Sequence, residues 1–125
     1  MSAPRPAGPL RPEHVPKPWG HETIWARTDR YVGKILHVRA GESLSLQYHR
    51  AKEETMRVLS GALRLEVGGA GEEAQVVRLG PGEGWHIPPG TRHRVTALED
   101  TDVLEVSTTE LDDVVRLEDR YGRIK

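Results

Sequence analysis

The sequence predicts an all-β protein of about eight short strands, arranged as a sandwich or barrel. Three observations support this. Apolar and polar residues alternate over short stretches, as they do in strands with one buried face. The 125 residues include 13 Gly and 9 Pro, which supply many turns. The expected strands recur about every 8–12 residues. Because Phe is absent and aromatic residues make up 5%, Val, Leu and Ile must fill the core.

Two regions frame these strands. Six of the nine prolines lie between Pro4 and Pro18, so residues 1–16 are predicted to be an extended Pro-rich arm, followed by one domain over residues 17–125. Residues 111–117 fit either a helical turn or a last strand, and a charged C-terminal tail follows. The strands expected between these regions are 32–38, 43–49, 55–59, 62–67, 74–79, 85–87, 93–98 and 103–107.

Composition excludes several classes of function. A net charge of −1 gives no general attraction to nucleic acid or to an anionic membrane, so neither is expected as a partner. With no cysteine, disulfides, thiolate metal sites and cysteine nucleophiles are absent. No apolar stretch approaches the roughly 20 residues of a membrane span. The N-terminus lacks the apolar region of a secretory signal, so a cytoplasmic location is expected.

Two segments carry the residues that indicate chemistry. The first spaces Gln47, His49 and Glu54 between two glycines, and the second places His93 after a Pro-Pro-Gly turn. Gln47 and His49 are two residues apart on an expected strand and therefore share a face. Two imidazoles, a carboxylate and an amide oxygen form a mixed nitrogen and oxygen site. Such a site suits one divalent ion per chain, which could be Zn, Mn, Fe, Co or Ni.

These two segments resemble the two motifs of the cupin superfamily, whose members are double-stranded β-helix (jelly-roll) barrels. The cupin pattern supplies two His, a Glu and a third His to the metal, and here Gln47 stands in place of the first His. The context Leu44-Ser-Leu-Gln-Tyr-His49 is similar to one branch, the cupin of type II phosphomannose isomerases. That cupin also forms a domain of bifunctional mannose-1-phosphate guanylyltransferases.

Further stretches across residues 17–123 carry the same resemblance. They are Lys17-Pro-Trp-Gly20, Val58-Leu-Ser-Gly61, Ile87-Pro-Pro-Gly-Thr-Arg-His-Arg94, Leu104-Glu-Val-Ser107 and Asp112-Asp-Val-Val-Arg-Leu-Glu-Asp-Arg-Tyr-Gly-Arg123. The resemblance implies metal-dependent interconversion of mannose 6-phosphate and fructose 6-phosphate. It also implies a homodimer, to which the Pro-rich arm can add contacts.

The resemblance also nominates residues around the metal. Lys52, Arg116 and Arg123 are the expected catalytic cations, because a sugar phosphate needs positive partners. Arg94 and Trp19 are expected to bind the substrate, Trp19 by stacking on a sugar face. Where the family usually reads His-Arg-Ala-Glu-His, this chain reads Ala51-Lys-Glu-Glu-Thr55, and two of these departures matter: Lys52 replaces the Arg, and Thr55 replaces the second His.

Three alternatives to the isomerase remain open on the sequence. One is a cupin that binds a sugar or phosphosugar without converting it, which the change at Thr55 favours. Another is a different metal-dependent cupin enzyme, such as an oxygenase. Gln47 argues against the oxygenase, because iron cupin oxygenases mostly present three His to the metal. The last is a structural cupin with an empty site.

Overall fold

The computed structural model describes residues 6–124, which contain eleven strands and no helix. The strands are β1 Glu13–Lys17, β2 Gly20–Arg27, β3 Val32–Val38, β4 Leu46–Tyr48, β5 Glu54–Ser60, β6 Leu63–Gly68, β7 Gln75–Leu79, β8 Gly84–Ile87, β9 Arg92–Ala97, β10 Thr101–Ser107 and β11 Val115–Glu118. All pairings between them are antiparallel. The predicted all-β jelly-roll class is confirmed.

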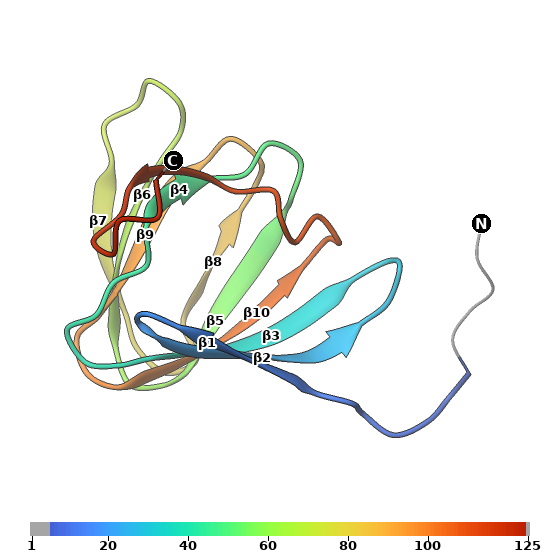
Figure 1. Cartoon of the computed structure of the whole chain (residues 1–125). Coiled ribbons are helices and arrows are strands. Elements are labelled where there is room, and N and C mark those ends of the chain that lie inside the picture. Colours follow the sequence, from blue (N-terminus) through green and yellow to red (C-terminus); the bar gives the residue numbers. More distant parts are fainter. Residues whose placement is uncertain (1–5, 125) are drawn as a thin grey trace.

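Two sheets enclose the interior of the molecule (Figure 1). One has the strand order β1-β2-β3-β10-β5-β8, and the other has the order β11-β4-β9-β6-β7. Neighbours such as β3 and β10 are distant in sequence, as expected of a jelly roll. This strand connectivity brings the end of β4 and the starts of β5 and β9 to the same end of the barrel.

The eight expected strands correspond to β3 through β10, whereas β1 and β2 were missed for physical reasons. In β2 the inward positions are Glu22 and Ile24, both buried. A carboxylate at an interior position breaks the apolar alternation by which strands are recognised. β1 contains Pro16 but lies at a sheet edge, where a missing N–H costs no ladder hydrogen bond. The ambiguous segment 111–117 contributes to β11.

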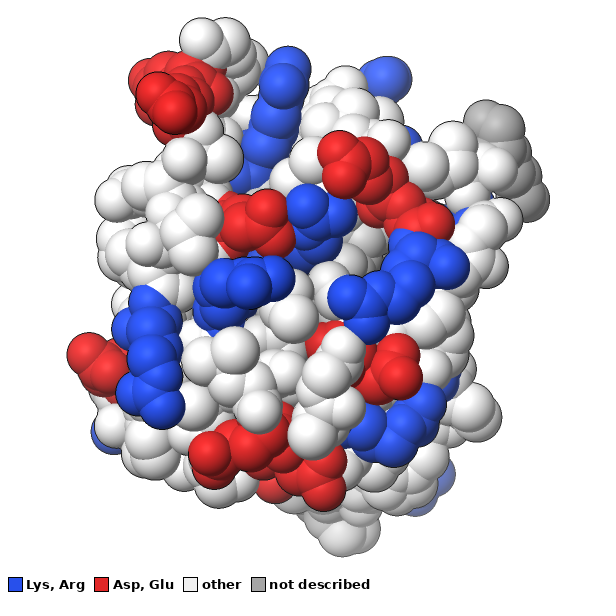
Figure 2. Space-filling view, turned by 90° about the vertical axis from the view of Figure 1, so that its left-hand side faces the viewer, with Lys and Arg blue, Asp and Glu red and all other residues white. Residues whose placement is uncertain are grey.

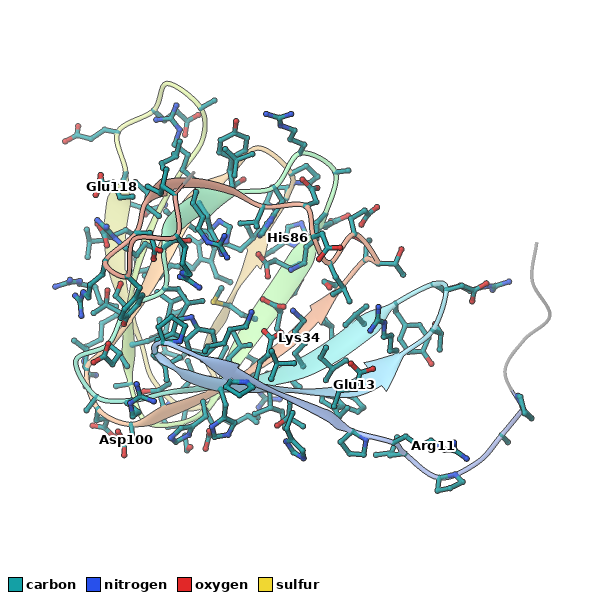
Figure 3. The ribbon with its side chains drawn as sticks, viewed as in Figure 1. Arg11, Glu13, Lys34, His86, Asp100 and Glu118 are labelled. Carbon is teal, nitrogen blue, oxygen red and sulfur yellow. The ribbon has the colours of Figure 1, made fainter. Side chains whose placement is uncertain are left out.

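The predicted N-terminal arm falls into three parts. Residues 1–5 lie outside the described residues. Residues 6–12 are exposed and extend away from the barrel, as Figure 3 shows for Arg11. Residues 13–16 belong to β1, which pairs with β2 along its whole length. The end of this segment is therefore an edge strand of the six-stranded sheet.

The barrel interior changes character along its length. At one end, the core end, both sheets contribute apolar side chains that are fully buried, among them Val38, Val58, Leu63 and Val103. At the other end, the polar end, the same strands contribute ionisable groups. On β5 the inward series is Glu54, Met56, Val58, and on β9 it is His93, Val95, Ala97. The alternation places each series on one face.

Candidate metal centre

Three ionisable side chains converge at the polar end. His49 follows β4, Glu54 begins β5 and His93 lies in β9; all three are buried. Their ligand atoms lie within 4.8 Å of one another. Glu54 Oε1 is 2.8 Å from His49 Nε2 and 3.1 Å from His93 Nε2. Gln47 is the register partner of His93 across β4 and β9, and it lines a small cavity together with Glu54 and His93.

Hydrogen bonds on the far side of each imidazole fix its tautomer. His49 Nδ1 donates to the carbonyl oxygen of Asp113 at 2.6 Å, and His93 Nδ1 donates to that of Thr91 at 2.9 Å. A carbonyl oxygen only accepts, so the proton of each neutral ring sits on Nδ1. Each Nε2 then presents a lone pair toward Glu54. This is the arrangement that orients histidines bound to metal ions.

The donor set fits a divalent cation. When both rings are neutral, no proton lies between their Nε2 atoms and the Glu54 carboxylate oxygen. The lone pairs of these three atoms then repel one another unless a cation binds between them. His93 Nε2 is buried and has no hydrogen-bond partner among the described residues. Gln47 Oε1 accepts from Ser45 Oγ at 3.0 Å and stands beside the group. His49, Glu54 and His93 would therefore hold a metal ion, and Gln47 could supply a further oxygen.

A tight turn positions His93 relative to His49. Gly90 donates its backbone N–H to the carbonyl of His49 at 2.7 Å, which joins the two ligand segments. Its φ is +83°, a region that residues with a Cβ rarely adopt. The Pro-Pro-Gly turn expected from the sequence is present, and Gly90 is needed there for its backbone conformation.

A second group of charges adjoins the three ligands. Lys52 Nζ lies 3.8 Å from Glu54 Oε2 and 3.7 Å from Glu105 Oε2, and all three residues are buried. Burial alone would raise the pKa of Glu54, but the adjacent Glu105 carboxyl, the two imidazoles and Lys52 together lower it well below its usual range. Burial and the adjacent charge of Glu54 raise the pKa of Glu105 to about 8. Burial would lower the pKa of Lys52, but the surrounding carboxylates outweigh it and raise that pKa.

A cavity of about 100 Å³ opens beside these groups. Its wall contains all three predicted catalytic cations, Lys52, Arg116 and Arg123, together with Trp19. Arg116 Nε is buried and has no hydrogen-bond partner among the described residues. Arg123 is held by Asp119 through contacts of 2.8 and 2.9 Å. Trp19 is buried within the hydrophobic core cluster, so packing restrains it at the cavity edge.

The six-stranded sheet adds charges to this wall that the sequence reading did not single out. Lys34 lines the cavity from β3 (Figure 3) and lies 3.4 Å from Glu22 Oε2. Lys17 Nζ is 3.9 Å from the other oxygen of Glu22. Lys34 and Glu105 are register partners on β3 and β10. The wall therefore alternates positive and negative groups across neighbouring strands.

Arg94 lies elsewhere. It follows His93 on β9, so its side chain points to the outer face of the five-stranded sheet and does not line the cavity. There it forms a two-fold contact with Glu66 at 2.7 and 3.0 Å and a contact with Glu118 at 3.1 Å. Figure 2 shows this side of the molecule, where acidic and basic side chains are interspersed. We therefore leave Arg94 out of the site.

The two departures from the family pattern fall on opposite faces of the protein. Lys52 is buried in the cavity wall. Thr55 is exposed on the outer face of β5, where its hydroxyl lies 3.1 Å from His86 Nδ1. Glu53 is also exposed, and its carboxylate lies 3.1 Å from His86 Nε2, so it points away from the site. A histidine at position 55 would lie outside the cavity, so this position does not test the metal chemistry.

The comparisons with known proteins agree with this fold. A cupin domain model matches residues 34–108, and the chain belongs to the cupin family. A mannose-1-phosphate guanylyltransferase, ManC, of Salmonella typhimurium is 38% identical over 118 residues, which cover 88% of this chain. The Escherichia coli K12 protein of the same activity is 36% identical over 118 residues. The chain spans 23% of the length of each of these relatives.

Solved structures share the fold. KdgF from Halomonas sp. has a TM-score of 0.67 at 23% identity and covers 82% of this chain and 90% of its own. Oxalate decarboxylase from Bacillus subtilis has a TM-score of 0.77 at 15% identity, over 92% of this chain and 33% of its own. At such identities the likeness concerns the fold alone. Residues 6–124 contain no helix that could cross a membrane.

Proposed function

We propose that this cupin is a metal-dependent aldose–ketose isomerase acting on a phosphorylated hexose, with mannose 6-phosphate and fructose 6-phosphate as the pair to test. The observation that carries the proposal is the convergence of His49, Glu54 and His93 beside a cavity walled by cations. The resemblance to phosphomannose isomerase cupins supplies the reaction. The full-length activity of the guanylyltransferases is not carried over, since the chain spans 23% of them.

Different groups of the site bind different parts of the substrate. A bound divalent metal would supply a Lewis acid for the C1 and C2 oxygens of the sugar. Arg116 and Arg123 bind the phosphate, because guanidinium groups match phosphate geometry and the buried Arg116 Nε has no hydrogen-bond partner among the described residues. Trp19 and Leu44 form an apolar wall for the sugar carbons. The resulting charge pattern favours an anionic substrate of small size.

Isomerisation also requires a proton to move between C2 and C1. Two carboxyls of the cavity wall lie outside the three-residue ligand group: Glu22, which is paired with Lys34, and Glu105, which has Lys52 beside it. Placed against the sugar, Glu105 takes the C2 proton and returns it to C1. Lys52 gives a proton to O1 and receives the one from O2, so the atoms balance over the enediol. This assignment leaves Glu54 free to bind the metal.

An assay of the metal-loaded protein tests the proposal. Proton NMR follows mannose 6-phosphate and fructose 6-phosphate with the wild type, with the chelated protein and with Glu54→Gln. We expect interconversion that stops on chelation, returns with added metal and is absent in the variant. Metal-loaded protein that binds the sugar phosphates by calorimetry without converting them would instead establish the second candidate, a phosphosugar-binding cupin. The alternating charges of the wall suit that candidate equally well.

We also propose that two copies of the chain associate through the outer face of the six-stranded sheet. Trp25, Ile35, Leu104 and Val106 lie on neighbouring strands of this face, and Val106 is 48% exposed. A sheet face in contact with water is normally polar. Light scattering should give a dimer for the wild type and a monomer for Val106→Glu. A monomeric wild type would contradict the association.

A further inference from the structure

Asp113 makes an unusual number of contacts with the loop that joins two of the predicted ligands. Its carboxylate accepts hydrogen bonds from the backbone N–H groups of Arg50, Ala51 and Lys52, at 3.0, 2.7 and 2.9 Å. Its own backbone carbonyl oxygen accepts a hydrogen bond from His49 Nδ1, with 2.6 Å between the two atoms. One residue of the C-terminal segment thus contacts four consecutive residues of the chain that runs from His49 toward Glu54.

This loop is held from outside along its whole length. Residues 50–53 lie between β4 and β5 and belong to no strand. The next N–H, that of Glu53, donates to Thr108 Oγ1 at 3.0 Å. All four N–H groups of the loop are therefore satisfied by side chains of the C-terminal part of the protein. The loop conformation depends on these acceptors, since it has no ladder hydrogen bonds of its own.

The same segment also builds the cavity wall. Val114 follows Asp113 and lines the cavity, and Arg116 enters it from β11. β11 in turn pairs with β4, placing Arg116 opposite Gln47. Asp113 therefore lies at the junction between the ligand loop and the cation that we assign to the phosphate.

We propose that Asp113 is a positioning residue of the metal centre: its carboxylate fixes the loop between His49 and Glu54, and its carbonyl orients the His49 imidazole. This inference rests on the metal site of the proposed function. The backbone carbonyl remains in every variant of Asp113, but its position depends on the carboxylate that anchors the residue to the loop. Losing that anchor lets the imidazole and Lys52 shift together.

The matched pair Asp113→Asn and Asp112→Asn tests the proposal. Both variants remove one negative charge from adjacent positions, but among the described residues only the Asp113 carboxylate, and not that of Asp112, accepts hydrogen bonds from the loop. The asparagine amide keeps one acceptor oxygen and turns an N–H₂ group toward N–H donors. Partners behind a metal-bound histidine are typically worth about 10–100-fold in metal affinity. We expect Asp113→Asn to weaken Co²⁺ binding by about tenfold or more, with Asp112→Asn unchanged.

Two readouts distinguish positioning from general loss of structure. Affinity is measured by competition with a chelator, and the visible spectrum of bound Co²⁺ reports the geometry around it. Circular dichroism confirms that each variant is folded. Weaker binding with an altered spectrum in Asp113→Asn alone supports the proposal. Wild-type affinity in Asp113→Asn, or the same loss in Asp112→Asn, would overturn it.

A third variant covers failure to fold. Asp113→Glu keeps an ionised acceptor but moves it by one methylene, so the folded variant should still bind Co²⁺ less tightly than the wild type. Wild-type affinity for Asp113→Glu would overturn the positioning role. No substrate enters these titrations, so a wild type that binds Co²⁺ but lacks isomerase activity contradicts only the proposed reaction. A wild type that binds no Co²⁺ contradicts the metal centre and this inference together.

Discussion

The two ends of the barrel interior are built from the same strands, yet they contain opposite kinds of side chain. At the core end, Val58 on β5 faces Leu63 and its neighbours, all fully buried and apolar. At the polar end of the same strand, Glu54 meets His49 and His93, also buried. Both sets of side chains are buried, so burial alone does not distinguish core from site. What differs is that the buried groups at the polar end are charged or polar and therefore need a hydrogen-bond or ionic partner, whereas the apolar side chains at the core end do not.

This difference separates stability from chemistry. Apolar side chains at the core end gain free energy from burial in proportion to their area. Buried charges at the polar end are costly unless they are paired. The buried Lys and Glu side chains there each have an opposite charge within 4 Å, as Lys34 has in Glu22 and Lys52 has in Glu105. We expect substitutions at the core end to change folding and those at the polar end to change metal binding.

The largest effect is expected from Glu54→Gln. The change keeps the shape of the side chain but removes the charge that faces both imidazoles. Since partners behind the ligands are worth about 10–100-fold, loss of the ligand charge should weaken metal affinity by more than about 100-fold. Chelator competition measures the change, and urea unfolding verifies that the metal-free variant remains folded. Metal affinity within a few-fold of the wild type would show that the polar end holds no metal through Glu54.

A comparable effect at the core end should appear only in stability. Leu65 is fully buried, and Leu65→Ala leaves a cavity between the two sheets. Such changes cost about 2–5 kcal/mol of unfolding free energy. Urea unfolding measures the cost, and metal affinity of the folded variant should be unchanged. If Leu65→Ala reduced metal affinity as strongly as Glu54→Gln, the two ends would not be separable.

Gly90 connects the two kinds of effect, because it is a backbone requirement inside the site. Gly90→Val places a Cβ at a φ of +83°, which costs about 1–3 kcal/mol. His93→Ala, three residues on, should abolish metal binding and cost the metal-free protein less stability than Gly90→Val does. Unfolding both variants without metal makes the comparison. Equal stabilities would count against the turn, and complete unfolding of His93→Ala would indicate that the metal is structural.

A smaller effect is expected at the C-terminal ion pair. The hydrogen bond from Arg123 lowers the pKa of Asp119 to about 2. A depressed carboxyl pKa gives stability that is present above the unfolded value near 3.8 and is lost as the pH falls toward 2. Asp119→Asn should therefore cost about 1 kcal/mol or less at pH 7 and make unfolding less sensitive to acid over that window. Thermal melts between pH 7 and 2 measure this, and an unchanged acid limb would argue against the pair.

The smallest effect is expected from Thr55→His, which restores the residue found in the family pattern. Thr55 is exposed on the outer face of β5, so the new ring meets solvent and His86. Metal affinity and isomerase activity should match the wild type. A strong gain of activity would mean that the outer face takes part in the reaction, contrary to the division between inside and outside.

The sequence was informative where each residue had one role. Leu63, Leu65 and Val67 alternate with polar neighbours, and the structure buries them as predicted. The spacing of His49, Glu54 and His93 identified residues that the fold brings together. The sequence indicated a Pro-Pro-Gly turn before His93, and the positive φ of Gly90 is consistent with such a turn.

It was less informative where the roles of neighbours are mixed. Glu105 points inward, although it is charged, and its two neighbours Leu104 and Val106 are apolar. The alternation on this strand therefore does not identify its inner face. Asp113 sits in an acidic region beside Asp112, and only the three-dimensional contacts separate the two. Arg94 was nominated by the resemblance of its motif, whereas the structure places its side chain on the outer face of β9 against Glu66. Lys34 and Glu22 reach the cavity through pairing between strands, which local pattern does not reveal.

The central claim is that His49, Glu54 and His93 hold one divalent ion. Elemental analysis of the purified protein beside its His49→Ala/His93→Ala double variant tests it most directly, with both proteins first incubated with Zn, Mn, Co or Ni and then desalted. The account predicts about one metal ion per wild-type chain and none in the folded double variant. No metal in the wild type after any of these incubations, or equal metal in both proteins, would contradict it.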